Sequence, residues 1–165
     1  ITLEAWNKTL QLNLTSVMLS NKNAIQSFLE YKNAGSILNL GSVLGYSPAP
    51  HHFATHAYAT AKAAIIGLTK STAAFYASHN IRVNVLAPGL IETPMSQRSL
   101  TDEAIMNYIK TKQPLQNGRM GRPEDLDKAA CFFLSDYSAF TTGQVMAIDG
   151  GWGISEGQIF NQIGT

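Results

Sequence analysis

Tyr58 and Lys62 are the residues of this chain whose types and spacing point most directly to chemistry. They lie four residues apart in the stretch YATAK, at the start of a predicted helix. This spacing places both side chains on one helical face, one turn apart. A nearby ammonium group favours the phenolate and lowers a tyrosine pKa that is about 10 when unperturbed. A tyrosine tuned towards neutrality can act as a general acid or base, so the pair predicts proton transfer.

Ser42 and the pair Pro88 and Gly89 follow two predicted strands that must lie beside this helix. The apolar run SILNL at 36–40 lies between glycines and predicts a strand covered on both faces, which delivers Ser42 at its carboxyl end. The run IRVNVLAP at 81–88 predicts a second buried strand, ended by Pro88 and Gly89. Open α/β sheets bind ligands at such carboxyl ends. Ser42 could therefore hydrogen-bond a reacting carbonyl or alcohol, or it could be an ordinary turn serine.

Two long helices are predicted to flank the first strand. The apolar period predicts a helix over 3–31 with Thr2 as its N-cap and a bend or restart near 20–23. Asn13 falls on the apolar face of this helix, where an unpaired amide would cost about 1–3 kcal/mol, so we expect it to have a partner. A second helix, rich in small residues, is predicted over about 56–78.

The last third of the chain completes an α/β order. Residues 90–122 are the least regular part, with a short helix predicted from Thr101. Pro123 is predicted at the N1 position of a further helix, and QVMAID at 144–149 predicts a third strand. Short apolar strands separated by helical crossovers predict a parallel sheet with helices on its faces. The edge beside the first strand would be left open unless another segment pairs with it.

Composition argues against several classes of function. The formal net charge is +1 and the basic residues never form a run, which argues against a nucleic-acid or membrane partner. No apolar stretch approaches the roughly 20 residues of a membrane helix. The single cysteine, Cys131 in the run AACFFL, is predicted to be a buried core residue and excludes an internal disulfide. These features indicate a protein of the reducing cytoplasm that acts on small molecules.

The histidines and arginines of the irregular segments admit more than one interpretation. His52 and His56 are four residues apart, but no cysteine pair or carboxylate cluster accompanies them and His51, so no metal site is predicted. They could instead line a substrate pocket or be solvated in a loop. Arg119 and Arg122 could meet an acidic substrate or cap helices, and the second role is favoured.

Six motifs, in order along the chain, resemble the short-chain dehydrogenase/reductase family. They are WNKTLQLNL, LNLGSVLG, YATAK, RVNVLAPGLIETPM, GRPEDL and TGQVMAIDGG. The resemblance implies a doubly wound Rossmann-type parallel sheet, of which residues 1–153 form the C-terminal portion of a single domain and 154–165 a tail. It further implies an enzyme that uses NAD or NADP to interconvert a secondary alcohol and a ketone. The motif pattern is most similar to 3-oxoacyl-thioester reductases and sugar or polyol dehydrogenases.

The same resemblance assigns roles to four catalytic residues. Tyr58 would exchange a proton with the substrate oxygen, and Ser42 would hydrogen-bond that oxygen. Lys62 would lower the pKa of Tyr58 and hold the ribose hydroxyls of the cofactor. Asn13 would bind a water in a proton relay that reaches Lys62.

The family pattern also assigns cofactor contacts beyond Tyr58 and Lys62. The turn at Pro88 and Gly89 would abut the nicotinamide ring. Ile91 and Thr93 would bond its carboxamide and a nearby phosphate. The family is usually a homodimer or homotetramer, and the small-residue helix is compatible with such assembly.

The family's glycine-rich cofactor turn is missing from this sequence. No G-x-G-x-x-G or related spacing is present to hold a pyrophosphate at a helix N-terminus. We therefore expect that residue 1 is not the natural start of the protein. The alternative is a non-catalytic scaffold or assembly protein that keeps the fold without a cofactor site. An upstream strand followed by a glycine-rich turn would favour the enzyme.

Overall fold

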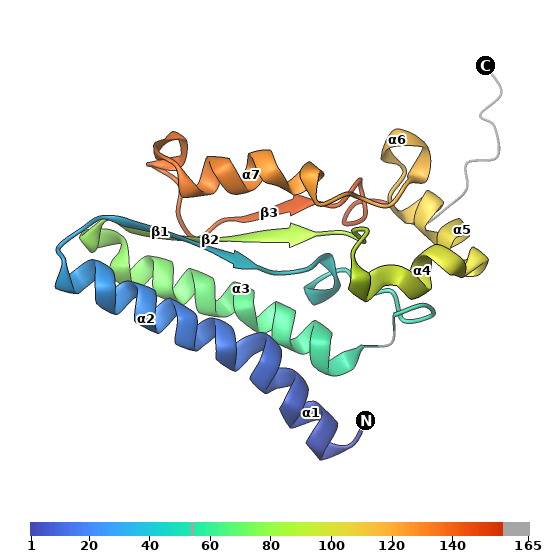
Figure 1. The fold of residues 1–165 in the computed structure, drawn as a ribbon, viewed down its shortest axis with the longest axis horizontal. Coiled ribbons are helices and arrows are strands. Elements are labelled where there is room, and N and C mark those ends of the chain that lie inside the picture. The colour runs from blue at the N-terminus through green and yellow to red at the C-terminus, as the bar shows by residue number, and fades with distance from the viewer. Residues whose placement is uncertain (54, 157–165) are drawn as a thin grey trace.

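A three-stranded parallel sheet forms the centre of the computed structural model, which describes residues 1–53 and 55–156. Its strand order is β1 (Gly35–Leu40), β2 (Ile81–Pro88) and β3 (Val145–Ile148). Gly35 pairs with Ile81 at the start of the β1–β2 ladder, and Val85 pairs with Val145 at the start of the β2–β3 ladder. The predicted α/β class and parallel sheet are confirmed (Figure 1).

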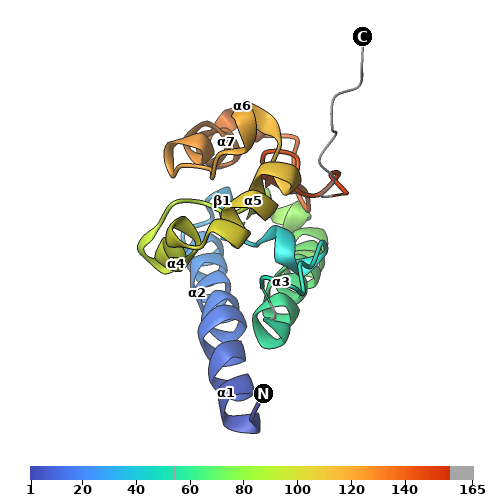
Figure 2. The same ribbon diagram turned by 90° about the vertical axis from the view of Figure 1, so that its right-hand side faces the viewer.

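Helices cover both faces of this sheet, as predicted. On one face lie α2 (Ser16–Glu30) and α3 (His56–Tyr76), and on the other lies α7 (Glu124–Leu134). The side view in Figure 2 shows α1 (Leu3–Leu10) continuing α2 and projecting beyond the sheet beside α3. The carboxyl ends of the strands therefore open towards the end of the molecule that carries α4 (Gln97–Thr101) and α5 (Glu103–Lys112).

The first helix begins as predicted but is distorted at a different point. The hydroxyl of Thr2 accepts a hydrogen bond from the Ala5 amide at 3.2 Å, which confirms the N-cap. The helix then widens into a π-helical turn at Gln11–Thr15 and continues without a break as α2. The predicted bend near 20–23 is wrong, because the backbone there continues its α-helical hydrogen bonding. A π turn is rare and often marks a functional site.

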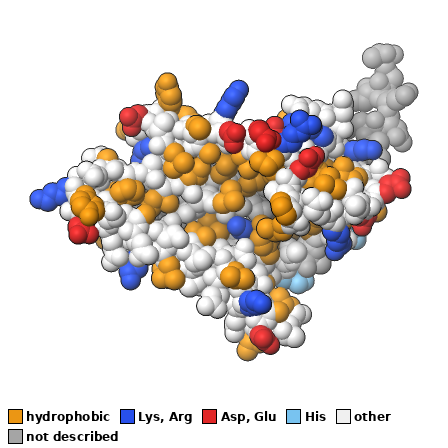
Figure 3. All heavy atoms as spheres, in the orientation of Figure 1, with side chains coloured by type: hydrophobic (Ala, Val, Ile, Leu, Met, Phe, Trp, Pro, Cys, Tyr) orange, Lys and Arg blue, Asp and Glu red, His pale blue; other side chains and the backbone are white. Residues whose placement is uncertain are grey.

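Strand β1 is less covered than the sequence predicts. Most of its residues are half-buried, and Leu40 remains 54% exposed. Within the described residues β1 pairs with β2 alone, so its outer edge is open. Figure 3 shows apolar side chains gathered across the middle of the face seen in Figure 1, over the sheet between α7 and α2. The prediction of a strand covered on both faces is therefore wrong for this part of the molecule.

Two apolar clusters hold the layers together. One joins α2, α3 and β2 through buried Ile25, Ala73, Ile81 and Val83. The other lies beyond the strand ends and contains Trp152, which is 1% exposed and donates its indole N–H to the Ser47 carbonyl at 2.9 Å. Trp152 also packs on Tyr108 of α5, with ring centroids 5.9 Å apart. This second cluster fixes the loop after Ser42 against α5.

Three details of the C-terminal third differ from the sequence predictions. Cys131 is exposed, because buried Phe133 faces the sheet and a residue two positions away lies on the opposite side of a helix. The helix α5 is capped by Asp102, whose carboxylate accepts from the Ile105 amide at 3.1 Å, rather than starting at Thr101. Pro123 lies one position earlier than predicted, at the N-cap of α7.

The remaining elements are short. They comprise α6 (Leu115–Gly118) and the 3₁₀ turns η2 (Val43–Gly45), η3 (Ala77–His79), η4 (Pro94–Ser96) and η5 (Asp136–Ser138). Most of the predicted tail at 154–165 lies outside the described residues. No helix in the described part of the chain is long and apolar enough to cross a membrane.

Candidate active site

Ser42, Tyr58 and Lys62 come together at the carboxyl end of β1. Ser42 is the N-cap of η2, is only 8% exposed, and has a hydroxyl close enough to Tyr58 to affect the Tyr58 pKa by hydrogen bonding. The Lys62 ammonium lies 5.4 Å from the centroid of the Tyr58 ring and donates to the Leu40 carbonyl at 2.9 Å. The predicted helical turn from Tyr58 to Lys62 is present, because both residues lie in the first two turns of α3, which begins at His56. A hydroxyl, a phenol and an ammonium thus share one small region.

Electrostatics at this site differ from the sequence expectation in one respect. The pKa of Tyr58 is raised above its ordinary value of 10.0, mainly because burial disfavours the phenolate, while the hydrogen bond with Ser42 acts in the opposite direction. Burial also lowers the pKa of Lys62. The expected lowering of the Tyr58 pKa by Lys62 is not seen, since the ammonium is directed at the Leu40 carbonyl. In this chain Tyr58 holds its proton at neutral pH.

Close packing of η2 on α3 sets the position of Ser42. A Cβ added to Gly45 would lie 2.8 Å from the Ala63 nitrogen and 2.9 Å from the Lys62 carbonyl carbon. Only glycine permits this approach, because both neighbours are helix backbone. The hydroxyl of Ser42 also accepts from the Leu44 amide at 3.2 Å, which orients its side chain. The site is therefore held by local backbone packing.

Asn13 lies in the π-helical turn, which packs against α3. It is half-buried, and its side-chain amide donates to the Thr9 carbonyl at 3.1 Å. The amide thus has a partner within its own helix rather than a direct contact with Lys62. The expected water relay from Asn13 to Lys62 stays a prediction.

The turn from Pro88 to Thr93 lies beside these residues at the end of the neighbouring strand. The Gly89 amide donates to the Ile148 carbonyl at 3.1 Å, which ties the turn to β3. Ile91 forms a bridge with Gly121, and Thr93 begins η4 with its amide donating to the Ser96 hydroxyl at 2.9 Å. The structure thus places all four predicted cofactor residues of this turn at one strand end. Their contact with a cofactor stays a prediction.

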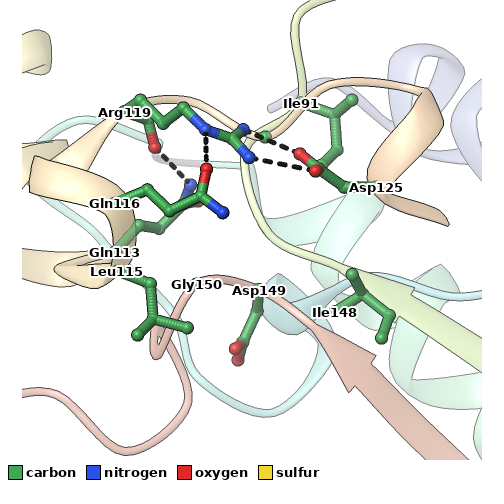
Figure 4. A pocket seen from close by; sticks show the side chains of 10 residues that line it. Ile91, Gln113, Leu115, Gln116, Arg119, Asp125, Ile148, Asp149 and Gly150 are labelled. Carbon is green, nitrogen blue, oxygen red and sulfur yellow. Dashed lines mark hydrogen bonds and ion pairs between the residues drawn. The ribbon is translucent and has the colours of Figure 1, made fainter.

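Other candidates from the sequence lie away from this group. His52 stacks on Tyr108, with ring centroids 4.5 Å apart, and belongs to the apolar loop contact with α5. No three histidine, cysteine, aspartate or glutamate side chains among residues 1–53 and 55–156 are placed to hold a metal ion. Arg119 forms a two-pronged ion pair with Asp125 at 2.7 and 2.9 Å, at the start of α7 (Figure 4). This pairing supports the capping role over an acidic-substrate role.

Two buried side chains hydrogen-bond the backbone of this turn, and the sequence analysis did not identify them. Gln113 is 2% exposed and bonds the backbone of Leu90, and Ser96 is 8% exposed and donates to the Ile91 carbonyl at 2.7 Å. Ser96 had a signal, since the spacing of Thr93 and Ser96 around a proline is typical of a helix start. Gln113 had none, because its neighbours KTKQPLQ show no apolar period.

Comparison with known proteins supports a particular family. A family model described as enoyl-(acyl carrier protein) reductase matches residues 1–153. The 2,5-dichloro-2,5-cyclohexadiene-1,4-diol dehydrogenase of Sphingobium indicum is 38% identical over 153 residues, which cover 92% of this chain and 59% of that protein. A protein of Xanthobacter autotrophicus described as inactive 2-(S)-hydroxypropyl-CoM dehydrogenase 2 is 40% identical over 152 residues, 90% of this chain and 64% of the relative.

A solved structure of 4-hydroxyisoleucine dehydrogenase complexed with NADH resembles this chain closely. Its TM-score is 0.85 at 33% sequence identity, and the match covers 92% of this chain and 60% of the other. The chain thus spans about three fifths of the length of the relatives it matches.

Proposed function

The chain belongs to the short-chain dehydrogenase/reductase family, and on that premise we propose that it carries the proton-transfer side of an NAD(P)-dependent oxidoreductase acting on a secondary alcohol or its ketone. The observation that carries the proposal is the convergence of Ser42, Tyr58 and Lys62 at the carboxyl end of β1. Residues 1–153 would form the C-terminal portion of that enzyme's single domain. The nucleotide could be NAD or NADP.

The donor groups at the strand ends fit the nicotinamide and ribose part of such a nucleotide. The Lys62 ammonium and the Tyr58 hydroxyl suit the ribose hydroxyls, and the Thr93 hydroxyl suits the carboxamide or a phosphate. The backbone of Pro88 and Gly89 would lie against the ring. Within the described residues no glycine-rich turn is available for the pyrophosphate, so the fit concerns one half of the nucleotide only.

Proton transfer would proceed from Tyr58. A bound nicotinamide would supply hydride exchange with the substrate carbon. Tyr58 keeps its proton because burial raises its pKa, so it suits the donor role towards the oxygen of a ketone undergoing reduction. Ser42 would hold that oxygen through its hydroxyl while Tyr58 gives up the proton. Lys62 would then stabilise the phenolate that remains, and Asn13 would help return a proton through water.

The substrate would be a small secondary alcohol or ketone that meets Ser42 and Tyr58 beside the loop after Ser42 and α5. Half-buried Phe53 and Tyr108, which pack on the buried Trp152 in that region, would suit a substrate with an apolar body. The related diol dehydrogenase and hydroxypropyl-CoM dehydrogenase are named for alcohols. We include a cytoplasmic location and a homodimer or homotetramer in the proposal. Exposed apolar side chains on the outer helices, Leu12 and Leu19 on one and Phe75 on the other, support assembly.

A scaffold without catalysis is the second candidate, since one relative at 40% identity is described as inactive. The two are separated by titrating the complete gene product with NADH and with NADPH and following nucleotide fluorescence. If the protein is an oxidoreductase, NADH or NADPH should bind, and binding of neither nucleotide would contradict that function. Tyr58→Phe should keep nucleotide binding and lower turnover by about 10²–10⁴-fold, as expected for loss of a general acid. Turnover retained in this variant would assign the proton donor elsewhere.

A further inference from the structure

Gln113 is a buried amide with no role in the proposed chemistry. It lies where α5 ends, and it is 2% exposed. Buried side-chain amides are costly unless their donors and acceptor are bonded. Its hydrogen-bond partners therefore indicate why the chain keeps a polar residue there.

The Gln113 amide binds both backbone groups of a single residue. Its Oε1 accepts the Leu90 amide hydrogen, and its Nε2 donates to the Leu90 carbonyl at 3.3 Å and weakly to the Arg119 carbonyl at 3.5 Å. A paired donor and acceptor on one residue reproduces what a neighbouring strand offers. Leu90 is the centre of the turn from Pro88 to Thr93, so the side chain holds the middle of that turn.

Backbone bonds hold the same turn on its other sides. The Gly121 amide donates to the Leu90 carbonyl at 2.9 Å, and the Glu92 amide donates to the Gly121 carbonyl at 2.8 Å. A Cβ on Gly89 would lie 2.6 Å from Gln113 Oε1 and 3.0 Å from the Asp149 Cα. The turn is thus closed in between β3, Gly121 and Gln113. Among these three supports Gln113 acts through its side chain, while the Ser96 hydroxyl holds the later part of the turn at Ile91 and Thr93.

The cavity beside Gln113 does not explain its burial as a ligand contact. This cavity, of about 230 Å³, lies behind the turn and is lined by Gln113, Gln116, Arg119 and Asp125 among others (Figure 4). Its polar side chains already bond one another, since Arg119 pairs with Asp125 and donates to Gln116 Oε1 at 2.6 Å. We therefore look to the turn, rather than the cavity, for the role of Gln113.

We propose that Gln113 is a positioning residue that fixes the turn from Pro88 to Thr93 in the conformation that receives the nicotinamide. This inference rests on the proposed function for its cofactor, and on hydrogen bonds of the chain itself for its geometry. Because Gln113 ends α5, it also ties the helix beside the substrate loop to the turn beside the cofactor. Removing the amide leaves the Leu90 amide and carbonyl with fewer partners and lets the turn move.

The test replaces the amide by an apolar group of similar length. Gln113→Met should accelerate hydrogen exchange at the Leu90 amide by roughly tenfold or more, because one hydrogen bond protecting it is lost. In the complete gene product the same variant should weaken binding of the nucleotide, NADH or NADPH, by roughly tenfold while the KM for the alcohol or ketone changes little. Gln116→Met is the matched control, since Gln116 lies on the exposed rim of the same segment and does not touch Leu90. It should leave both readouts at their wild-type values.

A conservative variant distinguishes positioning from general instability. Gln113→Glu keeps an acceptor for the Leu90 amide and, while its buried carboxyl group is protonated, a donor for the Leu90 carbonyl. Under those conditions it should restore slow exchange at Leu90 and bring nucleotide affinity back to within about threefold of wild type. If Gln113→Met does not fold, Gln113→Glu is compared with the wild type directly. Fast hydrogen exchange at the Leu90 amide of Gln113→Glu would then overturn the proposed hydrogen bonding between Gln113 and Leu90.

The two proposals fail in different ways. Wild-type protein that binds neither nucleotide overturns the proposed function and, with it, the cofactor role of Gln113. Wild-type binding with unchanged affinity in Gln113→Met overturns the positioning role alone. Unchanged exchange at Leu90 in Gln113→Met overturns the hydrogen-bond geometry itself.

Discussion

Adding one methyl group at Gly45 tests whether the packing of η2 on α3 positions Ser42. The new Cβ would lie 2.8 Å from the Ala63 nitrogen, and ordinary contacts begin at 3.4 Å, so η2 must retreat by about 0.6 Å. Helix backbone cannot yield as a flexible side chain would. Forcing an extra carbon into a packed contact typically costs about 1–3 kcal/mol of stability.

The same displacement should reach the chemistry. Ser42 caps η2, so its hydroxyl moves with the turn, away from Tyr58 on α3. A misplacement of about 1 Å can cost a hundredfold in rate, so we expect Gly45→Ala to lower kcat by roughly ten- to a hundredfold. Nucleotide affinity should change little, because Lys62 and the turn after β2 stay in place.

Gly67→Ala is the matched control for this variant. Gly67 lies inside α3, and a Cβ there would meet no atom within 4 Å. The substitution should raise the free energy of unfolding by about 0.5–1 kcal/mol and leave kcat unchanged. Urea unfolding and steady-state turnover of both variants give the comparison. A Gly45→Ala protein with wild-type stability and kcat would refute the reasoning.

Three further predictions concern buried or paired polar groups. Asn21 is 3% exposed and its side-chain nitrogen has no partner among the described residues, so Asn21→Leu should raise the free energy of unfolding by about 1–3 kcal/mol in urea. The control Asn39→Leu removes a bond to the buried Thr69 hydroxyl and should lower that free energy by a similar amount. A destabilised Asn21→Leu protein would imply that the Asn21 amide has a partner. The ion pair with Arg119 lowers the pKa of Asp125 from 3.8 to about 2, so the stability that this ion pair contributes is present above pH 3.8 and is lost as the pH falls through about 2. The urea midpoints of Asp125→Asn and wild type should therefore differ at pH 7 and converge near pH 2. A difference that does not change with pH would contradict this prediction. Tyr58 should ionise above pH 10 in the absence of nucleotide, measured as the difference in tyrosinate absorbance between wild type and Tyr58→Phe. Ionisation below pH 10 would instead show that Lys62 lowers the Tyr58 pKa, as the sequence predicts.

Local signals in the sequence predicted most elements of the fold. Thr2 caps the first helix, and Asn80 ends the segment after α3 in a left-handed conformation, with φ of 57°. Such signals depend only on neighbouring residues, which is why they transfer from sequence to structure. Ser42, Tyr58 and Lys62 were found for the same reason, since they lie on one strand end and the first turns of the next helix.

Features that depend on distant contacts were missed. The π turn at Gln11–Thr15 and the exposure of Cys131 follow from how whole helices lie on the sheet, not from a local pattern. The raised pKa of Tyr58 arises from burial and from where the Lys62 ammonium is directed, neither of which a spacing of four residues specifies. Gln113 lies in an irregular segment, so only its contacts with Leu90 reveal it.

Trp152 also bears on the order in which the molecule folds. Its indole bond to the Ser47 carbonyl spans 105 residues, and closing a loop of that length costs about 4 kcal/mol in its length-dependent entropy alone. Contacts of this kind tend to form after the local helices and strand pairs. Trp6 is half-buried on the first helix and has no such distant bond to the part of the chain that the structure describes. Tryptophan fluorescence should therefore report two events: a change at Trp6 with helix formation, and a later burial of Trp152 when the loop after Ser42 closes on α5.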